Sequence, residues 1–331
     1  MKTVKLEGNG VVRVVDAPIP RPGHGEVLIQ TAVSALCGSE LHAYRSEGQS
    51  QGNSGHEAAG SVAALGEGVS NLSVGQRVGA SAIAGCGKCA YCARGQYTWC
   101  PQFRFYGSMH AEYFLAAANA CQPLPDDVSW EAGVLLSGDG LGVPYHTSTK
   151  LSAAEIGTLA VFGVGPIGLG NVLVQAFLGR RVIAVDLSTL RLEMAIKLGA
   201  SDTVNAQQVD PVGQVRSLTG GAGVDACIEA AGRPETALAC FAAVRTAGTV
   251  VFNGEQGALP ISPSDQFIRR DITAVGAWYY HFSEFSRMLE LYRRGLRLLE
   301  LITHHYPVKQ AGDAFQQFAA RQTGKVLLRY L

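Results

Sequence analysis

The chain has 331 residues, of which 47% are hydrophobic and 16% charged, a composition that excludes a disordered protein and favours two domains. Its 27 basic residues balance 27 acidic ones, so no net field favours nucleic acid or a membrane surface as a partner. The first residues lack the apolar core of a signal peptide, and no apolar run reaches the roughly 20 residues of a membrane span. We therefore expect a soluble, cytoplasmic protein.

Residues 1–140 have the pattern of a β-rich region with few helices, because Gly, Pro and Asn turn signals recur at short intervals. The run 26–33 is predicted as a strand. Cys37 follows it in the sequence Cys-Gly-Ser-Glu-Leu-His, and His56 lies further on in Gly-His-Glu. A thiolate and an imidazole can hold a zinc ion that keeps a position open for a substrate. Taken alone, however, this pair fits a buried thiol and a satisfied histidine equally well.

Four of the eight cysteines lie close together, at Cys86, Cys89, Cys92 and Cys100. In a long chain without a secretory signal, such a cluster favours a metal over disulfides. Tetrahedral zinc suits four thiolates on tight loops, and four protein ligands leave no position for a substrate. We therefore predict a structural zinc lobe at 85–101. Unliganded thiols, a redox pair and an iron–sulfur cluster are the alternatives.

A different pattern begins near residue 158, where short apolar runs alternate with helical periodicity. This alternation is typical of βαβ units and a parallel sheet, so the fold class is predicted as α/β. Helices are predicted at 188–198 and 234–244. After Trp278 the alternation stops, and we expect a helix at 283–294 and a short strand at 325–328. The predicted strands of the parallel sheet are 158–162, 181–185, 202–204, 224–228, 249–252 and 272–275.

Gly163, Gly165 and Gly168 form a G-x-G-x-x-G sequence between the first of these strands and a predicted helix. The first glycine makes the turn, the second admits a pyrophosphate at the helix N-terminus, and the third allows close helix packing. Asp186 ends the second strand, where a carboxylate accepts from the ribose 2′-hydroxyl and repels a 2′-phosphate. The sequence therefore predicts a Rossmann domain that prefers NAD, with Arg191 near the adenosine ribose or pyrophosphate. The alternative is a glycine-rich turn with a solvated Asp.

Together these motifs resemble the zinc-dependent medium-chain alcohol and polyol dehydrogenases, over nearly the whole chain. The resemblance implies a GroES-like catalytic domain at 1–141, a Rossmann domain with a doubly wound six-stranded sheet at 142–281, and a segment, 282–331, that returns to the catalytic domain. It implies hydride transfer between NAD and a secondary alcohol of the polyol, sugar or cyclitol type. It further implies two zinc ions per chain and a homo-oligomer, either a dimer or a tetramer.

The resemblance also implies a catalytic zinc bound by Cys37 and His56, with Glu57 as a ligand or a close neighbour of the metal. Asp139 occupies the place of a further ligand, since His146 follows it as in polyol-type members; the alternative is an ordinary turn Asp. The four clustered cysteines match the family's structural zinc lobe.

Two further roles follow from the same resemblance. Ser39 and His42 match a relay that passes the alcohol proton through the nicotinamide ribose hydroxyls to solvent. Ile167, which follows Pro166 in the glycine-rich turn, matches the apolar residue behind the nicotinamide ring.

Departures from the family pattern limit the choice of substrate. The stretch 103–113 resembles polyol members in its Arg-Phe-x-Gly core but is shortened, and Tyr279 stands where many of them have an arginine. Both features argue against sorbitol itself. His110, His304 and His305 are expected at the surface or in the core rather than in a substrate pocket.

Two other functions stay open. One is a threonine-type amino-alcohol dehydrogenase. The other is a catalytically idle nucleotide-binding protein with a structural or regulatory role, against which the intact set of Cys37, Ser39, His42 and His56 weighs.

Overall fold

The computed structural model describes residues 1–151 and 156–330. Contacts along the chain divide it into two units, which are described separately. The first consists of Met1–Gly142, Tyr280–Arg293 and Leu298–Leu331, and the second of Val143–Tyr279 and Arg294–Arg297. Among the described residues, no helix combines the length and the apolar character needed to cross a bilayer.

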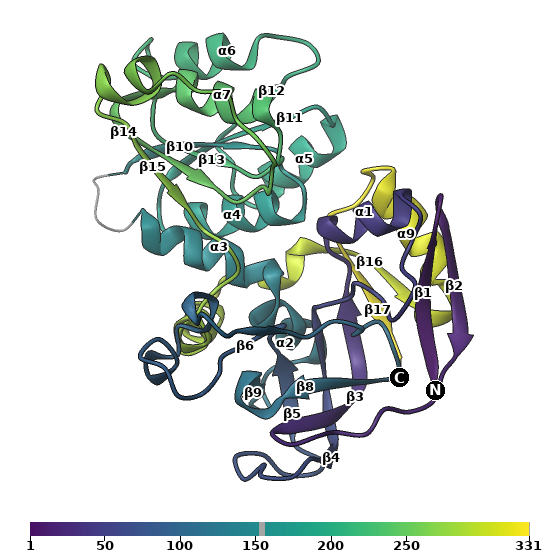
Figure 1. Ribbon diagram of the computed structural model, residues 1–331. Helices are drawn as coiled ribbons and strands as arrows, with labels where there is room; N and C mark the ends of the chain where they lie inside the picture. The colour runs from purple at the N-terminus through teal and green to yellow at the C-terminus, as the bar shows by residue number, and fades with distance from the viewer. Residues whose placement is uncertain (152–155, 331) are drawn as a thin grey trace. The chain divides into compact units, whose positions relative to one another are not determined.

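A seven-stranded sheet is the framework of the first unit (Figure 1). The strands follow the order β16-β17-β3-β4-β5-β9, and β8 pairs with β3 beside this path. Two smaller sheets pair β1 with β2 and β6 with β7. The strands of this unit are β1 (Lys2–Gly8), β2 (Val11–Asp16), β3 (Glu26–Ala35), β4 (Ala58–Leu65), β5 (Arg77–Ala80), β6 (Ile83–Ala84), β7 (Arg104–Phe105), β8 (Tyr113–Ala117), β9 (Cys121–Pro123), β16 (Ile302–Pro307) and β17 (Lys325–Arg329).

Strand β3 brings distant parts of this unit together at its C-terminal end. There it is antiparallel both to β4, through the pair Ser34 and Ala58, and to β17, through the pair Ala35 and Leu327. The residues just after β3, just before β4 and at the start of β17 therefore lie side by side. The helices of the unit are α1 (Leu41–Arg45), α2 (Trp130–Ser137), α8 (Phe285–Arg293) and α9 (Ala311–Ala319), and α3 (Asp139–Lys150) carries the chain into the second unit.

A six-stranded, all-parallel sheet forms the second unit, with the strand order β12-β11-β10-β13-β14-β15. Helix α4 contacts α5, and α6 contacts α7, which is the pairing expected when helices cover both faces of a doubly wound sheet. The strands are β10 (Thr158–Phe162), β11 (Arg181–Asp186), β12 (Asp202–Asn205), β13 (Val224–Glu229), β14 (Val244–Phe252) and β15 (Thr273–Gly276), and the helices are α4 (Pro166–Phe177), α5 (Thr189–Lys197), α6 (Pro211–Leu218) and α7 (Pro234–Ala243).

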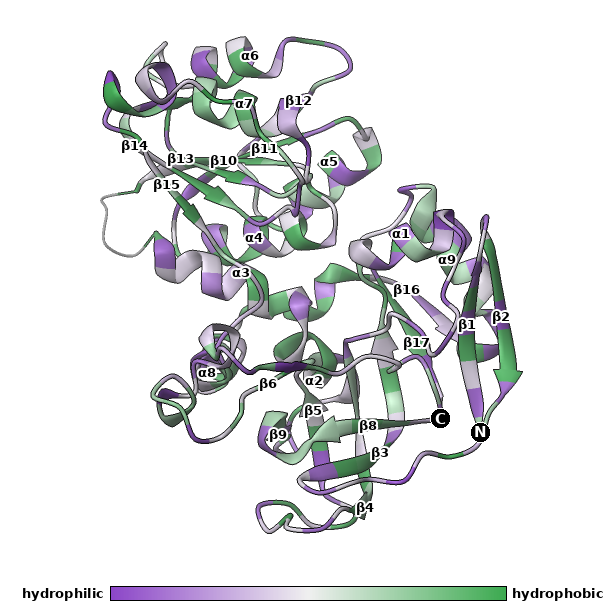
Figure 2. Ribbon diagram, viewed as in Figure 1, coloured by the Kyte–Doolittle hydropathy of each residue, from purple (hydrophilic) through white to green (hydrophobic). Residues whose placement is uncertain are grey.

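All six strands predicted for this sheet are confirmed, and so is the α/β class. The side chains of β10, β11 and β13 are buried almost continuously, because helices cover both faces, and Figure 2 shows β13 coloured mainly as hydrophobic. The edge strands β12 and β15 are more exposed. Strand β14 begins five residues earlier than predicted, at Val244 instead of Thr249. The predicted helices correspond to α5, α7 and α8, and the predicted C-terminal strand corresponds to β17.

Candidate active site and metal centres

Four buried side chains meet at the C-terminal end of β3: Cys37, His56, Glu57 and Asp139. One ligand atom from each lies within 4.8 Å of the ligand atoms of the others. The cysteine follows β3, the histidine and glutamate directly precede β4, and the aspartate is the first residue of α3. A hydrogen bond of 2.9 Å from the Ala35 N–H to the Glu57 carbonyl ties the first two segments together. The sheet register therefore brings these residues together from three separate stretches of the sequence.

The ring of His56 is oriented by groups behind it. Its Nδ1 lies 2.8 Å from the Ser54 carbonyl, to which it donates, and 3.7 Å from Oε1 of Glu40. Its Nε2 faces the cluster, 3.2 Å from Oδ2 of Asp139. A metal-binding imidazole is typically held in this way, with one nitrogen donating to a carbonyl or carboxylate and the other directed at the ion. Burial alone lowers the pKa of His56, but the adjacent Cys37 and Asp139 raise it well above its usual value.

Asp139 carries the clearest sign of an ion-binding site. Its Oδ2 is 3.5 Å from Sγ of Cys37, whereas its Oδ1 is buried with no hydrogen-bond partner. Burial alone would raise the pKa of this carboxyl, but the hydrogen bond from His56 and the nearby charges of His56 and Lys325 together outweigh burial and lower the pKa. A buried carboxylate oxygen without a partner is costly, and a cation within the cluster would satisfy it. The sulfur, nitrogen and oxygen donors of this site are those that zinc uses.

Glu57 differs from Asp139 because the protein already occupies both of its oxygens. Oε1 accepts from the ammonium of Lys325, the first residue of β17, and Oε2 accepts from the Gly140 N–H at 3.3 Å. Lys325 is only 1% exposed. Burial alone would lower the pKa of this ammonium, but the charge of Glu57 raises it, so the lysine stays protonated. Sequence reasoning missed Lys325, because nothing near it in the chain distinguishes a lysine paired in the core from one at the start of an exposed strand.

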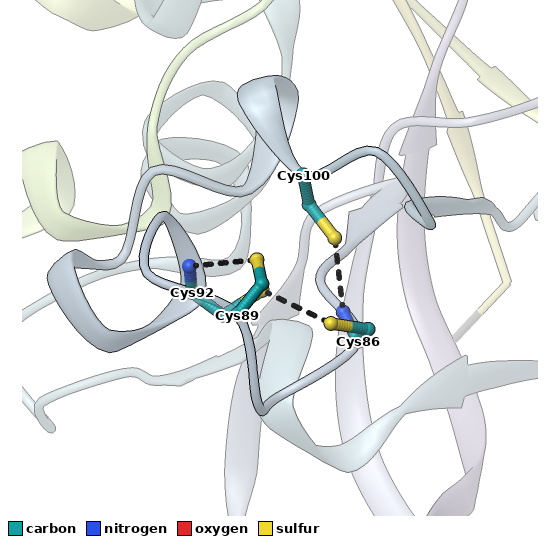
Figure 3. Close-up of side chains that lie close together, drawn as sticks. All are labelled: Cys86, Cys89, Cys92 and Cys100. Atoms are coloured by element: carbon teal, nitrogen blue, oxygen red, sulfur yellow. Dashed lines mark hydrogen bonds between the residues drawn. The ribbon is translucent and has the colours of Figure 1, made fainter.

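The four-cysteine cluster lies on the loop between β6 and β7, whose pairing of Ile83 with Phe105 closes the base of the loop. Figure 3 shows the four thiols facing one another, and their sulfurs lie within 4.8 Å of each other. Sγ of Cys92 is 3.5 Å from that of Cys89 and 3.9 Å from that of Cys86. Four sulfurs at the usual Zn–S distance are about 3.8 Å apart, so the loop already has the dimensions of a tetrathiolate zinc site.

The backbone of this loop supports thiolate charge. The N–H groups of Cys86 and Cys92 donate to sulfur at 3.4 Å. The N–H of Lys88 contributes most to lowering the pKa of Cys86 to about 6, whereas burial raises that of Cys92 to about 12. None of the eight cysteines is in a disulfide. Gly85 has no room for a side chain, since a Cβ would lie 2.5 Å from Sγ of Cys92.

Ser39 and His42 lie near Cys37 but differ from the metal-site residues in exposure. Ser39 is in the 3₁₀ turn that follows Cys37, His42 is in α1, and both side chains are exposed. No hydrogen bond joins these two side chains in the part of the chain that the structure describes. His42 is therefore placed to exchange protons with solvent, which Cys37 and His56 are not.

In the second unit, the glycine-rich turn connects β10 to α4, which begins at Pro166 and includes Ile167. Gly163 has φ +86°, and a Cβ there would lie 2.7 Å from that of Ala231. A Cβ on Gly168 would lie 2.0 Å from the Gly163 carbonyl oxygen, so the first turn of α4 packs directly on the preceding loop. Gly165 precedes the helix as its N-cap. The first and third glycines thus have the steric roles expected of them.

Asp186 ends β11 and holds the same turn in place. Its Oδ2 accepts from the Val164 N–H at 2.8 Å, and its Oδ1 accepts from the Ser188 N–H at 2.9 Å. The guanidinium of Arg191 borders the turn, 3.7 Å from where a Cβ of Gly165 would lie. The structure therefore brings the glycine-rich turn, Asp186 and Arg191 together.

The histidines that the sequence left unassigned have different environments. His110 is completely buried, His304 is partly exposed, and His305 is exposed. Tyr279, which replaces the arginine of many polyol members, is buried and has φ +54°, a conformation that is uncommon for a tyrosine.

Comparison with known proteins places the chain in a family. Residues 23–126 match an alcohol dehydrogenase GroES-like domain, and residues 166–294 match a zinc-binding dehydrogenase domain. The sorbitol dehydrogenase of Bacillus subtilis is 29% identical over 332 residues, which cover 96% of this chain and 93% of that protein. The L-threonine 3-dehydrogenase of Pyrococcus abyssi is 32% identical over 344 residues, which cover 99% of this chain and 97% of that protein.

A solved structure agrees with these relatives. The crystal structure of an alcohol dehydrogenase from Escherichia coli CFT073, complexed with NADH, matches with a TM-score of 0.88 and 26% identity, covering 100% of this chain and 99% of that chain. The chain belongs to the zinc-dependent alcohol and polyol dehydrogenases of the medium-chain dehydrogenase/reductase superfamily.

Proposed function

We propose that the protein catalyses hydride transfer between a secondary alcohol and NAD, with a catalytic zinc ion held by Cys37, His56 and Asp139. The observation that carries this proposal is the buried Oδ1 of Asp139, which has no protein partner within a cluster of sulfur, nitrogen and oxygen donors. A zinc ion with three protein ligands keeps a fourth position open for a substrate.

The charges of the site support a divalent cation. The thiolate of Cys37 and the carboxylates of Glu57 and Asp139 outweigh the ammonium of Lys325 by two negative charges, and all four residues are buried. Zinc neutralises this excess. Glu57 contacts Lys325 and the Gly140 N–H through its two oxygens, so we assign it as the charge partner of Lys325 and not as the third ligand.

When bound, zinc supplies a Lewis acid that lowers the pKa of the alcohol hydroxyl, and NAD accepts the hydride. In this proposal Ser39 is the first acceptor of the hydroxyl proton and is linked to His42 through the nicotinamide ribose hydroxyls of bound NAD, and the exposed His42 passes the proton to solvent. Cys37 and His56 are held by the sheet and by the groups behind them, so their contribution is fixed geometry. The four-cysteine lobe has no open position and takes a structural zinc.

We assign the first unit as the catalytic domain and the second as the NAD-binding domain. The positive φ of Gly163, the close packing at Gly168 and the carboxylate of Asp186 support a dinucleotide at the N-terminus of α4. The carboxylate of Asp186 can accept a hydrogen bond from a ribose hydroxyl but would repel a 2′-phosphate, so NAD is preferred over NADP. Ile167 is assigned to the nicotinamide side of the turn and Arg191 to the adenosine side.

For the substrate, we propose a polyol, sugar or cyclitol. A threonine-type amino alcohol is the second candidate, because a sorbitol dehydrogenase and an L-threonine 3-dehydrogenase have similar identity to this chain. We also propose a cytoplasmic homo-oligomer, since eight free cysteines suit a reducing compartment and closed symmetry is common among soluble enzymes.

Metal analysis combined with a coenzyme-reduction screen tests these proposals. We expect two zinc ions per chain and reduction of NAD in preference to NADP with at least one polyol, sugar, cyclitol or amino alcohol. One zinc per chain and no turnover with any of these substrates would favour the catalytically idle protein. If the protein reduced NADP as efficiently as NAD, the assignment of Asp186 to the ribose would be overturned, but the other assignments would stand.

A further inference from the structure

A chain of buried polar side chains lies behind the candidate catalytic site, and none of the roles assigned above involves its central member, His110. Nε2 of His110 is 2.9 Å from Oε2 of Glu40, and its Nδ1 is 2.8 Å from the Ser34 hydroxyl. That hydroxyl is 3.0 Å from the phenol oxygen of Tyr330. His110, Glu40 and Ser34 are all completely buried.

The direction of these hydrogen bonds follows from their chemistry. A carboxylate can only accept, so the N–H at Nε2 of His110 donates to Glu40. In the tautomer that has its proton on Nε2, Nδ1 accepts from the Ser34 hydroxyl, and the oxygen of that hydroxyl accepts from Tyr330. Each member is satisfied in one continuous chain, and fully satisfied buried networks of this kind hold side chains in a unique arrangement.

Both the backbone and the ring of His110 are held by neighbouring residues. Asn53 accepts from its backbone N–H at 3.1 Å and donates to its carbonyl at 3.2 Å. A Cβ on Gly55 would lie 2.6 Å from Cγ of His110, so the ring lies directly against the backbone that precedes His56. Phe315 of α9 contacts the ring edge to face, at 6.1 Å between centroids. His110 therefore packs directly against the segment that presents His56.

Glu40 connects this rigid histidine to two candidate zinc ligands. Its Oε1 accepts from the Cys37 N–H at 3.3 Å and is 3.7 Å from Nδ1 of His56. Without His110, the buried carboxylate loses its strongest partner and is free to rotate away from both groups. Groups that hold metal ligands in this way typically change metal affinity by about 10–100-fold when they are removed.

We propose that His110 is a positioning residue that holds Glu40 against Cys37 and His56, and thereby sets the affinity of the catalytic site for zinc. This inference rests on the proposed function, because it requires that the site binds zinc. It assigns no contact between His110 and the substrate. The four-cysteine lobe contains none of these residues, so it serves as an internal reference in the same molecule.

The test compares zinc affinity at the two sites of each variant by titration with a competing chelator. His110→Phe keeps the size of the ring but removes both hydrogen bonds. We expect catalytic-site affinity about 10–100-fold weaker than in the unmodified protein, unchanged affinity in the four-cysteine lobe, and turnover restored by added zinc. His110→Gln places an amide donor near the position of Nε2 and should keep most of the affinity, whereas His110→Asn places its amide toward Ser34 and should lose it.

Phe318→Leu is the matched control, since Phe318 is buried in the same apolar cluster as Phe315. It should lower the melting temperature without changing zinc affinity. Equal affinity in the unmodified protein and a folded His110→Phe variant would overturn the inference. If that variant does not fold, equal affinities of the Gln and Asn variants would overturn it instead. An unmodified protein that binds only one zinc would refute the proposed function, an outcome recognised before any variant is made.

Discussion

The two candidate metal centres of the first unit are built in opposite ways. The four-cysteine lobe takes all of its donors from one short loop, and its backbone N–H groups stabilise the sulfurs. The cluster around Cys37 takes its donors from three distant segments, is buried, and is supported by buried side chains behind it, among them Lys325 and Glu40. A local site of four thiolates serves stability, whereas a site that must keep a position open needs a rigid surrounding structure.

The largest effect is expected from Cys37→Ser. Removing this thiolate should release one zinc ion per chain and reduce turnover by on the order of 10³-fold or more, since Lewis-acid stabilisation is worth several kcal/mol. Zinc analysis and steady-state kinetics measure both changes, and the four-cysteine zinc should remain. If Cys37→Ser retained two zinc ions and normal turnover, Cys37 would not be a ligand of a catalytic zinc, and the contrast between a catalytic and a structural centre would be lost.

Lys325→Met should affect stability next most strongly. It leaves Glu57 buried without its partner, which typically costs about 3–5 kcal/mol. Denaturant unfolding measures this loss, and the double variant Lys325→Met, Glu57→Gln should recover much of it because no uncompensated charge remains. A double variant no more stable than Lys325→Met would show that the ion pair is not the source of the effect.

Cys89→Ser should separate stability from chemistry. Loss of the lobe zinc should lower the free energy of unfolding by at least about 2 kcal/mol, while the turnover of the folded fraction changes little. Thermal unfolding followed in parallel with active-site titration distinguishes the two quantities. Unchanged stability and assembly in a variant shown to lack that zinc would contradict a structural role for the lobe.

The smallest effect is expected from His42→Ala. Both zinc ions should remain, and the rate should fall roughly 10–100-fold, since water partly replaces a relay residue that faces solvent. The same variant assayed with added imidazole should recover part of the rate. A loss of zinc in His42→Ala would instead place this residue among the groups that hold the metal site.

The sequence predicted the second unit most accurately because its central strands β10, β11 and β13 are buried on both faces and form short, largely apolar runs. Thr158–Phe162 matches the predicted strand at both ends. The predicted start of β14 was wrong because the polar residues Arg245 and Thr246 interrupt the apolar run, although β13 still pairs with this region at Val244. Strand pairing with a neighbour therefore extends an element beyond what its own residues indicate.

Helix α3 could not be recognised, because Gly138, Gly140 and Gly142 surround Asp139 and suggest a turn. In the structure these glycines allow close packing: a Cβ on Gly138 would lie 2.7 Å from a Glu57 oxygen, and one on Gly142 would lie 2.2 Å from the ring of Tyr280. Asp139 is consequently the first residue of a helix and not a turn residue. Local helix propensity does not reveal that contacts with distant side chains, here those of Glu57 and Tyr280, require glycine within a helix.

The same limit applies to the candidate site. Cys37, His56 and the four clustered cysteines stand in short recognisable motifs, and the structure brings each group together. Lys325 lies 268 positions from its partner Glu57, and His110 lies 70 positions from its partner Glu40. Neither residue stands in a recognisable motif. Their roles arise from pairing across the sheet and not from sequence spacing.

The position of Lys325 in the chain has a consequence for synthesis on the ribosome. The segments that carry Cys37 and Glu57 emerge early, but the counter-ion of Glu57 lies 268 positions later, in β17. Until β17 docks against β3, the carboxylate of Glu57 has no cationic partner, so the first unit cannot complete its core before β17 has been synthesised. The second unit, encoded almost entirely between these two parts, is free to fold first.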